Sequence, residues 1–284
     1  MTSNLTKLMN ISFVSSMNAE LYHYYGKRFL EEFGKYSSGN IKLFIIFEGE
    51  YPDEIMHISE NIYIFPLNNP KHASFLRKFR HLQEANGLRI KDIKVEGKIK
   101  KHLSYDYRWN AIRFSFKPFS IHQVLDVLPE NTDFLIWTDS DLRCKKNFSS
   151  EDLIEFMPTN NEVMSYLGRK DSYSECGFLG FNLNNKFTSM YVERMINIYE
   201  TGEIFSIDQW HDSFIWDWAR KEFEEKNELN FKNISGSGYD KEHVFMNTKL
   251  SNFFDHLKGP QRKQDGISKE EDNSRAISGK IIIK

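Results

Sequence analysis

The stretch Asp133-Phe-Leu-Ile-Trp-Thr-Asp-Ser-Asp141 is the part of the chain from which the fold can be inferred first. Its apolar residues 134–137 form a short run bounded by polar ones, a pattern typical of a buried strand. Two carboxylates, Asp139 and Asp141, follow this run directly. Because ligands in open α/β sheets bind beyond the carboxyl ends of strands, this pair indicates a candidate site at a sheet edge.

Strands and helices are expected to alternate on both sides of this stretch. Apolar runs predict strands over residues 11–16, 41–47, 61–65, 133–138, 162–167 and 177–183, and helical spacing predicts helices over 19–33, 71–85, 109–128, 184–200 and 209–225. This alternation predicts an α/β fold, a single Rossmann-like domain with a mostly parallel central sheet flanked by helices.

Three local features refine this prediction. Asn18 is expected to cap the first helix and Asp208 the last one, since both residue types favour that position. Pro118 is expected to kink a helix or to start a new one. The Lys-rich stretch 87–102 has a weak pattern and is expected to be a mobile loop over a cleft.

The composition limits the classes of protein that this chain can represent. Its 284 residues are 40% hydrophobic and 15% aromatic, which excludes a disordered protein and is enough for a sizeable core. A net charge of −2, from 38 basic and 40 acidic residues, gives no global positive field of the kind that nucleic-acid-binding proteins use. We therefore expect no nucleic acid partner.

Cysteine usage and hydropathy favour a cytoplasmic location. Cys144 and Cys176 show neither a CxxC pair nor metal-ligand spacing, which indicates reduced thiols. No apolar run approaches the roughly 20 residues that span a bilayer, and residues 1–11 lack the apolar core of a signal peptide. A cytoplasmic protein is therefore expected, with peripheral membrane contact left open.

The pair Asp139 and Asp141 has the chemistry of a divalent metal site. Two carboxylates at this spacing can approach one ion, and oxygen ligands suit Mg²⁺ or Mn²⁺, which keep positions open for phosphate oxygens. Such an ion would act as a Lewis acid on a diphosphate leaving group. The alternative is that Asp139-Ser-Asp141 is only a turn, because these residue types favour turns.

The segment Phe134-Leu-Ile-Trp-Thr-Asp-Ser-Asp-Leu142 resembles the hydrophobic run and DxD motif of glycosyltransferases with the GT-A fold. The resemblance implies that Asp141 coordinates the metal and that Asp139 contacts the metal or the ribose of a nucleotide-sugar. It also implies one GT-A domain over residues 1–263, with a nucleotide-binding half over about 1–145 and an acceptor-binding half over about 146–263. Residues 264–284 are expected to form a polar tail.

A second motif lies near the end of this domain. His256-Leu-Lys-Gly-Pro-Gln-Arg-Lys263 resembles the His-x-x-Gly-x-x-Lys motif of glycogenin-like and galactosyltransferase-like members of the fold. The resemblance implies that His256 completes the metal shell and that a cation binds the diphosphate. Arg262 occupies the Lys position here and Lys263 follows it, so either can serve. An imidazole ligand suits Mn²⁺ more than Mg²⁺.

The resemblance also implies donor contacts outside the two motifs. Arg113 and Lys117 precede the DxD strand, where the family places a Lys that contacts the donor, although both could be ordinary surface cations. Ser15, Ser16 and Asn18 leave the first strand where the family places uracil and ribose contacts. These five residues are the further candidates for donor binding.

Two carboxylates are the candidates for catalysis on the acceptor side. Glu175 precedes Gly177, which would allow close approach of a ligand to the backbone, in a segment that the family places beneath the sugar. Asp212 lies in a Trp-His-Asp segment that the family places near the acceptor. The alternative for Asp212 is an acid favoured by the helix dipole alone.

The resemblance implies a metal-dependent glycosyltransferase of the hexosyltransferase type, with Mn²⁺ or Mg²⁺ and a UDP-sugar as donor. It favours a bacterial or viral enzyme, because many eukaryotic members of the class carry a membrane anchor. The expected acceptor is a glycan or a lipid-linked glycan in the synthesis of a surface polysaccharide. A metal-dependent nucleotidyltransferase is the alternative enzyme, but the N-terminal Gly-rich loop of that class is missing. A non-catalytic carbohydrate-binding or scaffold protein is the other alternative, against which the intact Asp139, Asp141 and His256 argue.

Overall fold

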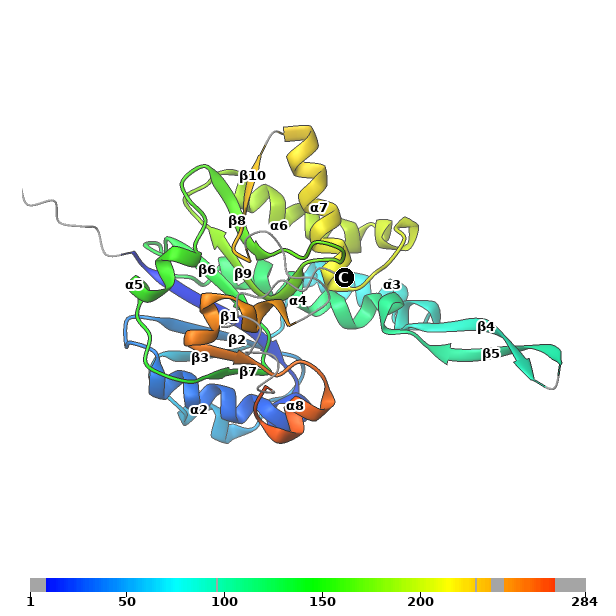
Figure 1. Cartoon of the computed structure of the whole chain (residues 1–284), viewed down its shortest axis with the longest axis horizontal. Helices are drawn as coiled ribbons and strands as arrows, with labels where there is room; N and C mark the ends of the chain where they lie inside the picture. The colour runs from blue at the N-terminus through cyan, green and yellow to red at the C-terminus, as the bar shows by residue number, and fades with distance from the viewer. Residues whose placement is uncertain (1–8, 96, 228, 236–242, 269–284) are drawn as a thin grey trace, which may run out of the picture.

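A computed structural model provides the structure of the protein, and it describes residues 9–95, 97–227, 229–235 and 243–268. Its centre is a seven-stranded sheet in the order β10-β8-β9-β6-β1-β2-β3 (Figure 1). These strands are β1 (Ile11–Met17), β2 (Lys42–Phe47), β3 (Ile62–Pro66), β6 (Phe134–Thr138), β8 (Glu162–Leu167), β9 (Glu175–Asn182) and β10 (Asn230–Asn233). The six strands predicted from the sequence are all present.

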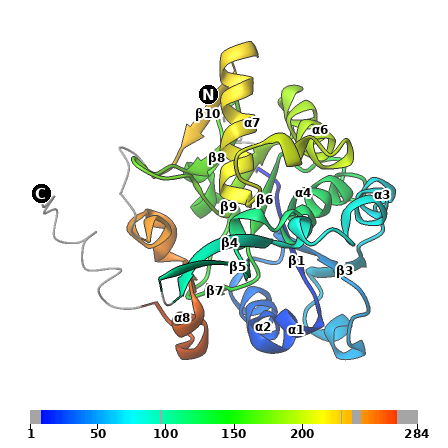
Figure 2. The same ribbon diagram turned by 90° about the vertical axis from the view of Figure 1, so that its right-hand side faces the viewer.

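The sheet is mostly parallel. β1 pairs in parallel with β2 and β6, β2 with β3, and β8 with β10, whereas β9 is antiparallel to both of its neighbours. Helices cover both faces, as Figure 2 shows from the side. They are α1 (Ala19–Leu21), α2 (Lys27–Tyr36), α3 (Pro70–Phe79), α4 (Ala111–Leu125), α5 (Ser150–Leu153), α6 (Phe187–Glu200), α7 (Asp212–Asn227) and α8 (Pro260–Asp265). The prediction of an α/β fold with a mostly parallel, helix-flanked sheet is confirmed.

Alternate residues of the central strands enter two separate cores. Val14 and Trp137 point into the core under α3, α4, α6 and α7, whereas Phe13 and Ile136 point into the core on the side of α2. This is why the strands read as apolar on both faces in the sequence. Packing on both sides holds these strands in place, and the residues that follow their carboxyl ends form the candidate site.

A small second sheet crosses the end of the domain. β7 (Leu142–Cys144) pairs antiparallel with β11 (Phe254–His256), so the chain's late segment lies directly against the stretch that follows β6. Past residue 263, α8 continues to Asp265, and the buried Ser268 donates hydrogen bonds to both Asp255 carboxylate oxygens through its backbone and side chain. The predicted boundary at residue 263 therefore falls inside a helix, and residues 269–284 lie outside the described residues.

The stretch 87–102 is not a loop, so this expectation was wrong. It forms most of a long hairpin, β4 (Leu88–Val95) and β5 (Lys98–Tyr105), that projects from the body of the molecule (Figure 1). Gly87 and Gly97 take φ values of 80° and 78°, which suit the bend before β4 and the tight turn. Neither core includes a described residue of this hairpin, so the hairpin lacks the buried apolar face that usually marks a strand in the sequence.

Three helix predictions need correction in detail. The helix expected over 19–33 contains a π-helical turn at Tyr22–Gly26, which separates α1 from α2. The helix at 109–128 continues through Pro118, which lies inside α4 and neither ends it nor starts a new one. The last predicted helix begins at Asp212, so Asp208 lies outside it and does not cap it. Asn18 does cap α1, accepting a hydrogen bond from Leu21 N at 2.8 Å.

No helix among the described residues combines the length and the apolar character that crossing a bilayer requires.

Candidate active site

The pairing of the strands brings distant segments to one edge of the sheet. Asp139 follows the carboxyl end of β6, and the parallel strands β1, β2 and β3 end at the same edge. Because β9 runs the opposite way, its first residues lie here, and Asp139 N donates to the Gly177 carbonyl at 3.3 Å. β8 also ends here, two residues before Arg169. The edge is therefore lined by residues from both halves of the sequence.

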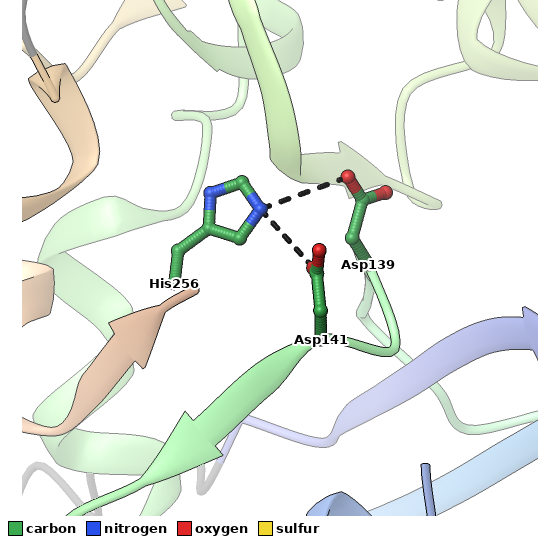
Figure 3. A group of neighbouring side chains, drawn as sticks. All are labelled: Asp139, Asp141 and His256. Carbon is green, nitrogen blue, oxygen red and sulfur yellow. Dashed lines mark ion pairs between the residues drawn. The ribbon is translucent and has the colours of Figure 1, made fainter. Parts of the chain in front are cut away.

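The β7–β11 ladder adds His256 to this edge. His256 lies opposite Leu142, the residue after Asp141, and Leu257 N donates to the Asp141 carbonyl at 3.3 Å. Its imidazole thereby faces the two carboxylates, as Figure 3 shows. His256 Nε2 lies 3.2 Å from Asp141 Oδ1 and 3.9 Å from Asp139 Oδ2. One ligand atom from each of the three side chains lies within 4.8 Å of the others, so the structure brings the predicted metal ligands together.

The chemistry of this group fits a divalent ion. It offers two carboxylates and an imidazole, a ligand set that suits Mn²⁺. Asp141 Oδ1 is buried, and the contact described for it is the ion pair with His256 Nε2 at 3.2 Å, which leaves it able to bind an ion held between the two side chains. The backbone makes room for the imidazole, since a Cβ at Gly177 would lie 2.6 Å from His256 Cε1. Gly177 was expected to admit a ligand, and the structure shows that it admits the imidazole of His256.

The two cations of the C-terminal motif lie in different places. Lys263 Nζ lies 2.6 Å from Asp141 Oδ2, at the metal-ligand group. Arg262 Nη1 donates to the carbonyl of Lys258 at 3.1 Å, within its own segment. The sequence left open which of the two would serve a diphosphate, and only Lys263 reaches the carboxylates among the contacts that the structure describes.

Lys117 lies deeper than a surface cation would. Its ammonium donates to Asp212 Oδ2 at 2.6 Å and to the Cys176 carbonyl at 2.9 Å, and it lies 3.0 Å from Asp139 Oδ1. Only 8% of its side chain is exposed, so all three contacts are shielded from water. Burial works to lower the pKa of Lys117, but Asp139 and Asp212 raise it above its ordinary value. Lys117 therefore stays charged and ties two acidic residues together.

The protonation of the metal-ligand group follows from its neighbours. Burial works to raise the pKa of Asp141, but His256 and Lys263 hold it below its usual range. Burial works to lower the pKa of His256, but Asp141 and Glu175 raise it. Without a bound ion, the imidazole and Lys263 thus supply the positive charge that Asp141 requires.

Asp212 and Glu175, the predicted catalytic carboxylates, are both ion-paired. Asp212 uses one oxygen for Lys117 and the other for the Ser213 N–H, at 2.8 Å. Glu175 pairs with Arg169 and Lys258, and its Oε1 lies 3.7 Å from His256 Nδ1. Burial works to raise the pKa of each acid, but these cations lower it. Both are held as carboxylates, without the raised pKa that a general base at neutral pH would have.

None of the contacts described for the residues at the end of β1 reaches the metal-ligand group. Ser15 is fully buried in the strand, and its hydroxyl has no hydrogen-bond partner among the described residues. Ser16 donates to Glu48 Oε1 at 3.0 Å. Asn18 caps α1 and also lines a second cavity of about 520 Å³, together with Glu48. Arg113 is exposed, and its positive charge works to lower the pKa of both Glu48 and Tyr25. Its charge therefore acts both on the second cavity and on the neighbourhood of the metal-ligand group.

The metal-ligand group forms one wall of a cavity of about 640 Å³. Other parts of the lining come from the segment 107–114 and from the start of α7, and they carry aromatic and polar side chains. Those that the sequence did not single out include Tyr107, Arg108, Arg169, Tyr173, Gln209, His211 and Lys258. Gln209 and His211 stand beside Asp212 in its segment, and Lys258 stands at an unspecified position of the C-terminal motif. The other four belong to no motif, and only the fold brings them to the cavity.

Tyr25 is a further neighbour of the carboxylates that the sequence did not single out. It lies in the π-helical turn, and the Lys263 ammonium is 4.8 Å from its ring centre. Burial, Asp141 and Asp139 all raise the pKa of its hydroxyl, which keeps it neutral. π-helical turns inside helices are often found at functional sites, but the sequence pattern did not predict this one.

No protein-family model and no curated protein sequence matches this chain. Several solved structures are similar to it. Mouse xyloside xylosyltransferase 1 in its apo form is 12% identical to this chain, with a TM-score of 0.43. The match covers 79% of this chain and 84% of that one. The apo glycosyltransferase GlyE of Streptococcus pneumoniae TIGR4 is 12% identical, with a TM-score of 0.44 over 80% of this chain and 46% of that one.

The galactosyltransferase LgtC, in complex with donor and acceptor sugar analogs, is also similar. It is 13% identical to this chain, with a TM-score of 0.40, and 72% of this chain and 69% of that one are covered. These three solved structures are all glycosyltransferases.

Proposed function

We propose that this protein is a metal-dependent glycosyltransferase that moves a sugar from a nucleotide-sugar to a hydroxyl of a glycan or a lipid-linked glycan. The observation that carries the proposal is the placement of Asp139, Asp141, His256 and Lys263 along one wall of a cavity of about 640 Å³. Pockets for small substrates usually have volumes of about 300 to 1,000 Å³. A divalent-ion site beside a cation suits a diphosphate, and the rest of the cavity suits a sugar and its acceptor.

The metal site would be held by three residues. Asp139, Asp141 and His256 would bind Mn²⁺, or Mg²⁺, and the ion would neutralise the leaving diphosphate as a Lewis acid. Lys263 already contacts an anion here, since its ammonium is 2.6 Å from Asp141. It is therefore the cation that we assign to the diphosphate, as a point charge rather than a bidentate partner.

The nucleoside fits the second cavity. Asn18 and Glu48 line it beyond the ends of β1 and β2, on the side of the sheet edge where donors of this kind are expected to lie. The charge of Arg113 acts on both Glu48 and Tyr25, so it links this cavity to the metal-ligand group. We propose UDP as the nucleotide, with the uracil and ribose near Asn18.

The acceptor fits the aromatic part of the same cavity. Tyr173 and His211 lie with ring centres 5.5 Å apart, and Tyr107 is 5.9 Å from His211. Gln209 adds amide groups to these rings, and aromatic faces beside hydrogen-bonding groups suit a sugar ring. Asp212 begins the adjacent helix α7, and its ion pair with Lys117 keeps it a carboxylate. We assign to it the roles of orienting the acceptor hydroxyl and stabilising positive charge on the sugar.

This pairing also bears on stereochemistry. An inverting enzyme needs a general base near the acceptor hydroxyl, with a pKa close to the working pH. Asp212 and Glu175 both have lowered pKa values because cations contact them. We therefore favour transfer with retention of the anomeric configuration.

Thermal melting with UDP tests the proposal. UDP with Mn²⁺ should raise the melting temperature, and neither component alone should do so to the same extent. A panel of UDP-sugars should then show Mn²⁺-dependent release of UDP. A nucleotidyltransferase would instead release pyrophosphate from a nucleoside triphosphate, and a binding protein would be stabilised without releasing UDP. Either of those results would contradict the proposal.

A further inference from the structure

The β4–β5 hairpin has no role in the site described above, and one of its faces exposes large apolar side chains to solvent. The pairing register places Ile90 opposite Leu103 and Lys94 opposite Ile99. These residues therefore share one face with Tyr105, since side chains two apart in a strand point the same way. The exposed fractions are 68% for Ile90, 75% for Ile99, 46% for Leu103 and 52% for Tyr105.

The same hairpin is strongly basic. Residues 88–105 contain six Lys or Arg and two acidic residues, in a chain whose net charge is −2. Arg89 stacks on Trp109 at 4.0 Å and Lys91 pairs with Asp106 at 3.1 Å, both near the root. Farther out, the exposed lysines make no ion pair with any described residue; they are Lys94, Lys98, Lys100 and Lys101. The outer part of the hairpin is thus a cluster of free positive charge with aliphatic side chains among it.

We propose that this hairpin docks the protein on the surface of an anionic lipid bilayer. Lysines would remain in the headgroup layer, where each basic residue near an anionic surface contributes attraction. The aliphatic side chains and Tyr105 would enter the boundary between headgroups and acyl chains, as apolar residues of interfacial elements do. The proposal goes beyond sugar transfer and does not depend on it.

The mixture of side chains favours a bilayer over a nucleic acid. Phosphate backbones are bound by cations, and bases by aromatic stacking, so exposed Ile90, Ile99 and Leu103 would contribute little to either. Pairing of the hairpin edge with a second copy is opposed by the lysines along β5, since charged edges discourage such pairing. A bilayer uses both the charge and the aliphatic surface.

The root of the hairpin is fixed to the cavity wall. Asp106 pairs with Lys91 of β4 and accepts from Arg108 Nη2 at 2.7 Å. The Trp210 N–H donates to the Arg108 carbonyl at 2.7 Å, and the rings of Trp109 and Trp210 meet edge to face with centres 5.2 Å apart. Tyr107 and Arg108, directly after the hairpin, line the cavity. Docking of the hairpin would therefore set the orientation of the cavity relative to the bilayer.

Co-sedimentation of the full chain with lipid vesicles tests this. Phosphatidylcholine vesicles serve as the neutral surface, and vesicles in which phosphatidylglycerol is about a third of the lipid serve as the anionic one. Wild-type protein should partition onto the anionic vesicles at least about tenfold more strongly, and added salt should weaken that binding.

Two hairpin variants and one matched control make the test specific. The charge variant combines Lys94→Gln, Lys98→Gln, Lys100→Gln and Lys101→Gln, and the apolar variant combines Ile90→Ser, Ile99→Ser and Leu103→Ser. Each should lose at least about tenfold in partition onto anionic vesicles. The control carries the same number of exposed lysines changed elsewhere, Lys27→Gln, Lys35→Gln, Lys145→Gln and Lys221→Gln, and should bind as the wild type does.

The melting temperatures of all variants should stay near that of the wild type, because the changed side chains lie outside both cores. Equal binding to both kinds of vesicle, or wild-type binding by the charge variant, would overturn the proposal. Loss in the charge variant alone would also overturn it and point to a polyanion such as nucleic acid. Self-association without vesicles that the apolar variant abolishes would point to a second copy. Release of UDP in solution should be unchanged in both hairpin variants, so a failure here leaves the proposed function intact.

Discussion

Asp141 is the residue on which the candidate metal site depends most. It faces His256 Nε2 and Lys263 Nζ at 3.2 and 2.6 Å, and its Oδ1 atom is buried. We expect Asp141→Asn to weaken Mn²⁺-dependent UDP binding by at least about 100-fold, since removing a ligand should cost no less than removing a residue that supports one. Titration calorimetry with UDP and Mn²⁺ measures this.

The control for that measurement is Asp171→Asn, which changes an exposed carboxylate outside the metal-ligand group. It should bind UDP as the wild type does. If Asp141→Asn kept its metal-dependent affinity for UDP, the assignment of the metal site would be wrong.

Glu48 gives the protein a specific dependence of stability on pH. Burial raises the pKa of this carboxyl to about 7, against the lowering effects of Ser16 and Arg113. A raised folded-state pKa stabilises the protein at pH values below the unfolded value of 4.5, and this contribution is lost as the pH rises through about 7. Glu48→Gln should therefore gain in free energy of unfolding relative to the wild type between pH 5 and 8, by up to about 3 kcal/mol.

Urea unfolding at several pH values checks this expectation. The gain should be small near pH 5 and largest near pH 8, because the wild-type carboxyl ionises between them. A constant difference across this range would mean that Glu48 is ionised throughout, and its place beside the second cavity would then offer a permanent negative charge.

At the scale of elements, Lys117 joins α4 to the start of α7 and to the end of β6. Its ammonium contacts Asp212 at 2.6 Å and Asp139 at 3.0 Å in a shielded position. Lys117→Met should lower the free energy of unfolding by about 1 to 3 kcal/mol, because it leaves two partly buried carboxylates without their cation. The double variant Lys117→Met, Asp212→Asn should recover part of the loss, and full additivity in chemical denaturation would show that the pair is not coupled.

The first residue of α7 should affect transfer more than donor binding. Asp212 lies on the cavity wall beside Gln209 and His211, and it is not one of the metal-ligand group. We expect Asp212→Asn to lower transfer to the acceptor more than hydrolysis of the donor, with the affinity for the donor nearly unchanged. Steady-state kinetics with and without acceptor separates the two rates. An equal loss of donor affinity would place Asp212 in the donor pocket, and wild-type turnover would leave it as an ordinary helix-start acid.

The elements also show what could be predicted from the sequence. Strands buried on both faces, such as β2 and β6, were predictable because their residues are apolar throughout. The short β7 and β11 were not, because their pairing joins residues more than 100 positions apart and each is only a few residues long. The direction of β9 was not predictable either, although it places Glu175 at the active edge.

The same distinction holds for the candidate site. Asp139 and Asp141 were predictable because a motif joins them to a strand end, and His256 because of its own motif. Tyr25 and Arg169 were not, because each becomes a site residue only through packing across the molecule. Lys258 stands at an unspecified position of the second motif, and its pairing with Glu175 required the structure. The alternative between Arg262 and Lys263 also required the structure, since it depends on which face of α8 meets Asp141.

At the scale of the whole molecule, the site joins segments that lie far apart in the chain. Asp139 and Asp141 follow β6, whereas His256 ends β11 and Lys263 lies in α8. UDP with Mn²⁺ should therefore slow amide hydrogen exchange in residues 139–144 and 254–265 together, since a ligand lowers local opening wherever it makes contacts. Exchange measured by mass spectrometry checks this. In His256→Ala, protection of the second segment should fall, and protection of one segment alone in the wild type would contradict a shared site.

Pro118 inside α4 has a consequence for the cavity. A proline has no N–H to donate, so the carbonyl of Phe114, four residues earlier, lacks its partner in the helix. Phe114 is one of the residues that line the cavity beside the metal-ligand group. The turn that carries Phe114 is therefore held to the rest of α4 by one main-chain hydrogen bond fewer than an ordinary helical turn, which leaves this part of the cavity wall freer to adjust to a ligand.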